Sequence, residues 1–226
     1  MKIAVLGTGP VGKAVAGRLA ELGHEVVVGT RDPAATLSRV EPDRFGNPPF
    51  SVWQEAHPAV GLAGLAEAAA EAELVVNATS GEGSMAALEA AGEDNLAGKV
   101  LVDIANPLDY SRGMPPSLLV ANTDSLGEQI QRRFPRTRVV KALNTMNAYL
   151  MVDPRQLAGG QHSTFVSGDD PEAKKAVTEL VASFGHTDII DLGDISTARG
   201  TEMYLPLWAR LYGGLGTPMF SIKIVR

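Results

Sequence analysis

The residues whose types and spacing carry the clearest chemistry are Gly7-Thr8-Gly9-Pro10-Val11-Gly12, in which three glycines follow the pattern GxGxxG. They separate an apolar run at residues 2–6 from an amphipathic stretch at residues 11–22. Between a strand and a helix, Gly7 permits a tight turn, Gly9 lets the backbone approach a pyrophosphate, and Gly12 allows close helix packing. The helix N-terminus would add free N–H groups and a partial positive charge. The pattern therefore predicts a dinucleotide site; the alternative is a tight turn without a ligand.

The end of the second apolar run indicates which dinucleotide this site takes. An NAD site usually has Asp or Glu at this point to accept from the ribose 2′-hydroxyl, whereas here Val26-Val27-Val28 leads into Gly29-Thr30-Arg31. Thr30 can donate its hydroxyl to a 2′-phosphate, and Arg31 offers a charge-assisted, bidentate contact. NADP is therefore favoured over NAD. Two alternatives stay open: Arg31 is a solvated turn residue, or Asp32 makes an NAD-type ribose contact.

Small and polar residues follow the next two apolar runs. The segments are Asn77-Ala78-Thr79-Ser80-Gly81 and Asp103-Ile104-Ala105-Asn106-Pro107. Open α/β sheets bind their ligands at the carboxyl ends of the strands, where such residues leave room for a ribose and a nicotinamide. Ala78, Thr79, Ser80 and Asn106 are therefore candidate cofactor-binding residues. Because Asn, Ser, Gly and Pro also serve in turns, a purely conformational role is the alternative.

No residue pattern supplies an obvious general acid. A short-chain dehydrogenase needs Lys four residues after a Tyr, but those positions hold Met114, Asp153, Trp208 and Gly216. The histidines lack metal-ligand spacing, so no metal site is predicted, and the absence of cysteine excludes a thiolate zinc site. Hydride transfer between two redox cofactors needs mainly close placement of two rings, so such an enzyme can work without an ionising side chain.

The elements that must position these residues follow a βαβ pattern, in which short apolar runs alternate with Ala-rich stretches. We expect strands at residues 2–6, 25–29, 74–78, 100–104, 138–143, 164–167 and 188–191, and helices at residues 11–22, 171–184 and 197–212, the last kinked at Pro206. Residues 33–58 predict an irregular surface excursion, and residues 219–225 an edge strand. The fold class is α/β: a Rossmann-type, doubly wound, mainly parallel sheet on residues 1–195, with a C-terminal helical cap on residues 196–226.

Composition excludes several function classes. The 226 residues are 45% apolar and carry 20 Lys and Arg against 26 Asp and Glu, a formal charge of −6. This acidic balance argues against a nucleic-acid partner, and no apolar run approaches the length of a membrane span. The N-terminus leads directly into a strand, and cysteine is absent, so we expect a cytoplasmic protein. The apolar last helix and the segment at residues 219–225 suggest a homodimer surface, or burial within one subunit.

Several segments together resemble the NADPH-dependent reductases of the deazaflavin coenzyme F420. They are Ile3-Ala4-Val5-Leu6-Gly7-Thr8-Gly9, Gly23-His24-Glu25-Val26-Val27-Val28-Gly29-Thr30-Arg31, Val139-Val140-Lys141-Ala142-Leu143-Asn144-Thr145, Val166-Ser167-Gly168-Asp169-Asp170, Asp191-Leu192-Gly193 and Tyr212-Gly213-Gly214-Leu215-Gly216. The resemblance covers nearly the whole chain. The glycine turn is common to many families, whereas the later segments in this order are more specific.

The resemblance implies site residues and a second cofactor. Thr8, Gly9, Pro10 and Val11 would line the pyrophosphate; Thr30 and Arg31 would hold the 2′-phosphate; Thr79, Ser80 and Ala142 would lie near the nicotinamide; and F420 would lie beside Asn144, Thr145 and Met146, closed by the end of the last helix. The chain departs from the family in having Asn144 where some members carry His, and in a longer excursion after Arg31. The related reductase domain of the membrane metalloreductases has a similar Lys-Gly-Phe-Asn stretch and uses a flavin.

These observations lead to one hypothesis and three alternatives. The leading hypothesis is an oxidoreductase that passes a hydride between NADP(H) and coenzyme F420 by positioning alone. The alternatives are an NADPH-dependent reductase of a flavin, a reductase of a small carbonyl compound, and a non-catalytic NADP-sensing protein.

Overall fold

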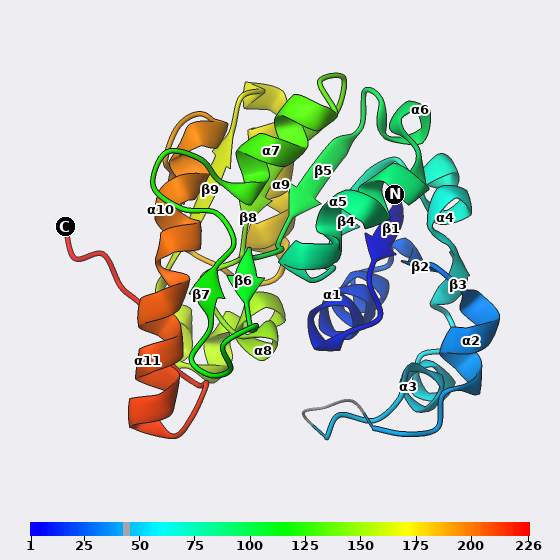
Figure 1. Ribbon diagram of the computed structural model, residues 1–226, viewed down its shortest axis with the longest axis horizontal. Coiled ribbons are helices and arrows are strands. Elements are labelled where there is room, and N and C mark those ends of the chain that lie inside the picture. Colours follow the sequence, from blue (N-terminus) through cyan, green and yellow to red (C-terminus); the bar gives the residue numbers. More distant parts are fainter. Residues whose placement is uncertain (43–45) are drawn as a thin grey trace.

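Eight strands form one sheet in the computed structural model, which describes residues 1–42 and 46–226 (Figure 1). In spatial order they are β10 (Asp188–Asp191), β9 (Ser163–Gly168), β8 (Arg138–Ala142), β5 (Val100–Asp103), β4 (Leu74–Asn77), β1 (Lys2–Leu6), β2 (Glu25–Thr30) and β3 (Gly61–Gly64). Neighbouring strands are parallel, except that β8 and β9 are antiparallel. The predicted Rossmann-type, mainly parallel α/β sheet and its seven predicted strands are confirmed, with ends shifted by one residue at most.

Helices cover both faces of this sheet, which explains the continuous apolar runs of its strands. Ile3 and Val5 pack with residues of α1, α3, α8 and α9, whereas Ala4 and Leu6 pack with residues of α4 to α7 and α10 on the other face. The helices are α1 (Pro10–Glu21), α2 (Pro33–Ser38), α3 (Phe50–Ala56), α4 (Leu65–Glu71), α5 (Gly81–Ala91), α6 (Glu93–Leu96), α7 (Leu126–Arg133), α8 (Ala148–Val152), α9 (Pro171–Ser183), α10 (Ala198–Met203) and α11 (Leu205–Leu215). Short 3-10 turns η1 (Pro154–Gln156), η2 (Ala158–Gly160) and η3 (Ile195–Thr197) complete the set.

The segment at residues 33–58 is more regular than predicted. It contains α2 and α3, whereas residues 43–45 lie outside the described part of the chain. Asp32 starts α2, because its carboxylate accepts a hydrogen bond of 2.9 Å from the Ala35 N–H and Pro33 occupies the first turn. Phe50 starts α3 and is buried against the core. The prediction of an irregular segment was wrong for α2 and α3, since proline also opens helices, whereas residues 39–42 and 46–49 are irregular as predicted.

The C-terminal region differs from its prediction in two places. The predicted single kinked helix is two helices, α10 and α11, separated at Tyr204, and α11 continues to Leu215 before Gly216 ends it at a φ of 67°. The edge strand predicted at residues 219–225 is wrong, because these residues form no strand. The Ser163 N–H donates to the Ile222 carbonyl, but the Ile224 N–H donates to the Ser163 hydroxyl, which interrupts a regular ladder. Two further strands, β6 (Leu108–Asp109) and β7 (Ser117–Leu118), form a separate antiparallel pair.

The buried imidazole of His186 makes the stability of this fold depend on pH. Burial lowers the pKa of His186 to about 4 from 6.5, although its hydrogen bond to the Met151 carbonyl opposes the shift. Since the unfolded chain binds this proton more tightly, the free energy of unfolding is unaffected above pH 6.5, falls as the pH drops below it, and stops falling below about 4.

We expect acidification from about pH 7.5 to about pH 5 to remove roughly 2 kcal/mol of stability through this group. Urea unfolding at the two pH values measures the loss. His186→Gln keeps a donor for the Met151 carbonyl and should remove more than half of the pH dependence. An unchanged dependence in His186→Gln would assign the acid sensitivity to other groups.

Candidate functional site

The turn between β1 and α1 requires glycine at two of its positions, Gly7 and Gly12. Gly7 has a φ of 124°, and a Cβ built on Gly12 would lie 2.0 Å from the Gly7 carbonyl oxygen. Gly9 is the N-cap of α1, and none of the described side chains makes a capping hydrogen bond to this helix. A Cβ on Gly9 would point into open space. The N-terminal N–H groups of α1 therefore face a gap that an anionic group can enter.

A cavity of about 390 Å³, here called the turn cavity, lies against this turn. It is lined by Gly7, Thr8, Gly9, Gly29, Thr30, Arg31, Leu65, Ala78, Thr79, Ser80, Glu82, Gly83, Ala86 and Ala87. β1 pairs with β2 on one side and β4 on the other, so the strand order reverses here. This is the crevice in which open α/β sheets bind nucleotides.

Thr30 and Arg31 lie on the wall of the turn cavity at the end of β2. The Thr30 hydroxyl is 2.9 Å from that of Thr36, and the exposed Arg31 guanidinium has no hydrogen bond or ion pair with the described residues. The Asp32 carboxylate caps α2 instead. This favours the 2′-phosphate prediction over an Asp32 contact to a ribose, because Arg31 is available and Asp32 is engaged.

A second cavity of about 590 Å³, here called the cleft, joins the turn cavity at Ala78, Thr79, Ser80 and Glu82. Three segments wall it: Ile104 to Tyr110 after β5, Asn144 to Met151 after β8, and Leu205 with Trp208 of α11. Pro10, Val11 and Gly81 complete the lining. Most of these groups are apolar or amides, and the ionisable side chains on the lining are Glu82 and Tyr110. The arrangement can hold a flat ring against the end of the turn cavity.

The corner after β8 is held in a strained conformation. Leu143 is buried and has a φ of 61°, in the left-handed region that bulky side chains rarely adopt. Next to it, Asn144 and Asn106 hydrogen-bond reciprocally: the Asn106 amide donates to the Asn144 carbonyl at 2.8 Å, and the Asn144 amide donates to the Asn106 Oδ1 at 3.0 Å. The two amides therefore fix one wall of the cleft to another.

A buried charge lies beneath this corner. Lys141 is 1% exposed, and its Nζ lies 2.6 Å from the Asp103 Oδ2 and 2.8 Å from the Glu202 Oε1. Burial alone would lower the pKa of Lys141, but the two carboxylates outweigh burial and raise it above its ordinary value. The Lys141 side chain beneath the cleft is therefore a positively charged ammonium.

The structure brings together most of the predicted site residues. Gly7, Thr8, Gly9, Thr30, Arg31, Ala78, Thr79 and Ser80 line the turn cavity, and Pro10, Val11, Asn106, Asn144 and Met146 line the cleft. Gly12 lines neither cavity and serves packing. Ala142 also lines neither, and its side chain is fully buried, so the predicted nicotinamide contact would have to come from its backbone. The buried Thr145 is likewise absent from the cleft lining.

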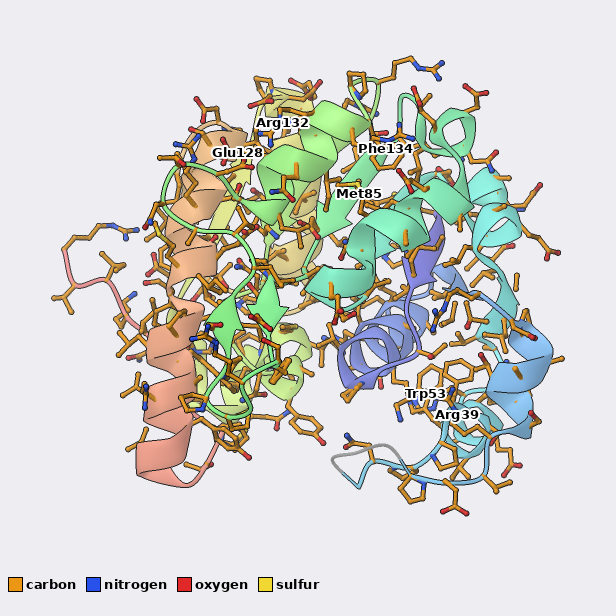
Figure 2. The ribbon with its side chains drawn as sticks, in the orientation of Figure 1. Arg39, Trp53, Met85, Glu128, Arg132 and Phe134 are labelled. Carbon is orange, nitrogen blue, oxygen red and sulfur yellow. The ribbon has the colours of Figure 1, made fainter. Side chains whose placement is uncertain are left out.

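Sequence reasoning missed several residues of the site. They include Glu82, Gly83, Ala86 and Ala87 of α5, and Tyr110 and Trp208 of the cleft. Arg39, at the end of α2 (Figure 2), lines a smaller cavity of about 100 Å³ with Thr8 and Lys13. A signal was available for Lys141, because a lysine inside the apolar run of β8 must find a partner when the strand is buried.

The described residues contain no cluster of three or more His, Cys, Asp or Glu side chains suited to a metal ion. None of their helices combines the length and apolarity that a membrane crossing requires.

Comparison with known proteins gives consistent matches. The family model described as "NADP oxidoreductase coenzyme F420-dependent" matches residues 2–107. The F420-dependent NADP reductase of Methanothermobacter marburgensis is 31% identical over 93% of this chain and 92% of that protein. The rat metalloreductase STEAP3 is 31% identical over 92% of this chain, which spans 38% of that protein's length.

A solved structure from Arthrobacter sp. FB24 matches this chain over its full length. The two chains are 66% identical, each is covered completely, and the TM-score is 0.96. That protein carries a provisional description as an F420-dependent NADP-reductase.

Proposed function

The chain belongs to the family of coenzyme F420-dependent NADP oxidoreductases, and on this premise we propose that it transfers a hydride between NADP(H) and the deazaflavin coenzyme F420. The observation that carries the proposal is the junction of two cavities at Ala78, Thr79 and Ser80. A dinucleotide in the turn cavity would bring its nicotinamide to this junction, where a second ring in the cleft could stack on it.

The turn cavity would hold NADP(H) through the glycine turn and the end of β2. Thr8, Gly9, Pro10 and Val11 would line the pyrophosphate, with the N-terminus of α1 supplying positive partial charge. Thr30 and Arg31 would bind the 2′-phosphate, supported by the availability of the Arg31 guanidinium. Thr79 and Ser80 would contact the nicotinamide half.

The cleft would hold the second cofactor beside Asn144 and Met146. When bound, F420 supplies ring carbon C5 as the acceptor of the hydride from nicotinamide C4. The protein's part is to hold the two rings face to face and to keep water out through apolar side chains such as Ile104, Met151 and Trp208. Reduction of the deazaflavin would also take up one proton, which would come from solvent, since no residue is proposed to transfer it.

A flavin is the second candidate for the cleft. The similarity to metalloreductase STEAP3 and the presence of Asn144 in the cleft wall favour this alternative over a small carbonyl substrate. The third alternative, a non-catalytic NADP sensor, is not retained, because the chain belongs to a family of oxidoreductases.

The proposal is tested by anaerobic mixing of the purified protein with NADPH and oxidised F420 while the visible absorbance of the deazaflavin is followed. We expect rapid bleaching with NADPH, slow bleaching with NADH, and no comparable reduction of FMN. Tight NADPH binding without bleaching would overturn the F420 assignment, and rapid reduction of FMN alone would replace it with a flavin.

We also propose an organisation of the chain into an NADP-binding part, residues 1–195, and a cap, residues 196–226, that completes the cleft. Leu205 and Trp208 support this because both line the cleft. The exposed Leu207, Tyr212 and Leu215 of α11 support a homodimer, which sedimentation equilibrium would detect. The cytoplasmic location stays a prediction.

A further inference from the structure

The three walls of the cleft converge on the ammonium of Lys141. Its Nζ donates to the Ala105 carbonyl at 2.7 Å, which ties down the segment after β5. Lys141 itself lies two residues before the strained Leu143 and three before Asn144, so it anchors the segment after β8. Its ion pair with Glu202 reaches α10, three residues before the cleft-lining Leu205.

The Lys141 Nζ lies within 2.8 Å of three oxygen atoms, those of the Ala105 carbonyl and of the Asp103 and Glu202 carboxylates, and the two carboxylates have further partners. The Glu202 carboxylate accepts from the Leu126 N–H at 2.8 Å and from the Gly127 N–H at 3.0 Å, at the start of α7. The Asp103 Oδ1 accepts from the Asn77 amide at 2.9 Å. A buried ammonium that pairs with two carboxylates and donates to a carbonyl holds its neighbours in a single arrangement.

The same network reaches the junction of the two cavities. The Asn77 Oδ1 accepts a hydrogen bond of 2.7 Å from the Thr79 hydroxyl, and Thr79 lines both the turn cavity and the cleft. An unbroken chain of polar contacts therefore runs from Thr79 through Asn77, Asp103 and Lys141 to Glu202 on the cap.

We propose that Lys141 is a positioning residue for the second cofactor: bridging Asp103, Ala105 and Glu202, it sets the distance between the cap and the sheet, and so the geometry of the cleft. The inference rests on the proposed function in that the cleft takes a redox ring. It makes a distinct claim, because the network should affect the binding of the hydride acceptor in the cleft and leave NADPH binding unchanged.

Glu202→Gln tests this claim, since it removes the negative charge that pairs the cap with the ammonium, while Asp103 still pairs with Lys141. The single amide oxygen also cannot replace both carboxylate oxygens, which accept from the Leu126 and Gly127 N–H groups. Glu128→Gln is the matched control. Glu128 on α7, labelled in Figure 2, pairs with Arg199 on α10. Each variant therefore removes one ion pair of α10, but Glu128 does not line the cleft and its partner is not Lys141.

The first readout is the fluorescence of Trp208 in a Trp53→Phe background, where Trp208 is the single remaining tryptophan. In Glu202→Gln we expect a red-shifted emission and roughly twofold greater quenching by acrylamide, as the cap loosens and water enters the cleft. Glu128→Gln should match the background protein. Because this readout needs no turnover, it tests the inference even if F420 is not the acceptor.

The second readout is steady-state kinetics with F420, and with FMN if only FMN is reduced. Glu202→Gln should raise the KM for the acceptor about tenfold and change the KM for NADPH by less than twofold. Unchanged Trp208 fluorescence and acceptor KM would overturn the proposal, as would equal effects in Glu128→Gln or equal increases in both KM values.

A neutral variant covers the case in which Glu202→Gln does not fold. Asp103→Asn, Lys141→Met and Glu202→Gln together remove every charge of the triad, and such replacements are often tolerated. It should fold and show the same rise in the acceptor KM. A folded neutral variant with the wild-type acceptor KM would refute the positioning role.

Discussion

Gly12→Ala should abolish useful NADPH binding, with an expected loss of affinity of at least about 100-fold, or roughly 2.7 kcal/mol. The reason is steric, because the new Cβ would lie 2.0 Å from the Gly7 carbonyl oxygen, and backbone cannot yield as a flexible side chain can. The turn must then open, which displaces the N-terminus of α1 from the turn cavity. Isothermal titration with NADPH measures the loss.

Gly200→Ala is the control for this substitution. Gly200 lies in α10, and a Cβ there would meet no atom within 4 Å. It should bind NADPH as the wild type does and gain a few tenths of a kcal/mol in stability. Near-normal NADPH affinity in a folded Gly12→Ala protein would show that the turn does not bind the pyrophosphate.

Arg31→Ala should weaken NADPH binding by about 1.5 to 3 kcal/mol, while NADH binding changes little. The guanidinium lines the turn cavity, is exposed, and has no partner among the described residues, so its loss leaves the folded chain intact. The substitution should lower the affinity only for a nucleotide that carries a 2′-phosphate. Titration of the variant with each nucleotide measures the difference.

Arg136→Ala controls for the loss of one surface positive charge. Arg136 pairs with Asp94 and Glu93 and lies just before β8 begins, at the strand end opposite to the cavities. It should leave both affinities unchanged. Equal losses of NADPH and NADH affinity in Arg31→Ala would contradict the assignment of NADP.

The sheet could be predicted from the sequence because its central strands are buried on both faces and so read as short apolar runs. β3 could not, since Gly61 and Gly64 leave half of that strand without side chains. α3 could not be predicted either, because Pro48 and Pro49 are typical of loops but here precede a helix that begins at the buried Phe50. The local sequence pattern therefore does not predict a strand that is rich in glycine or a helix that follows prolines.

Most of the turn cavity could likewise be predicted, because those residues adjoin in the sequence or follow strands at the same edge of the sheet, whereas its lining from α4 and α5 carried no such signal. The buried triad of Asp103, Lys141 and Glu202 could not be predicted. Lys141 alone signals a need for partners, but Asp103 and Glu202 come from distant segments, and only the packing of α10 against the sheet brings Glu202 to it. The apolar cap residues Leu205 and Trp208 carried no signal that they face a cleft rather than the core.

The most direct test of the account is a single anaerobic turnover of F420 with NADPH deuterated at nicotinamide C4, carried out separately for each face of the ring. The account predicts that deuterium from one face appears at C5 of the reduced deazaflavin without dilution by solvent hydrogen, because the rings stack in a water-excluding cleft. Reduced F420 that carries solvent hydrogen at C5 from both samples would contradict direct hydride transfer, as would the absence of any reduction.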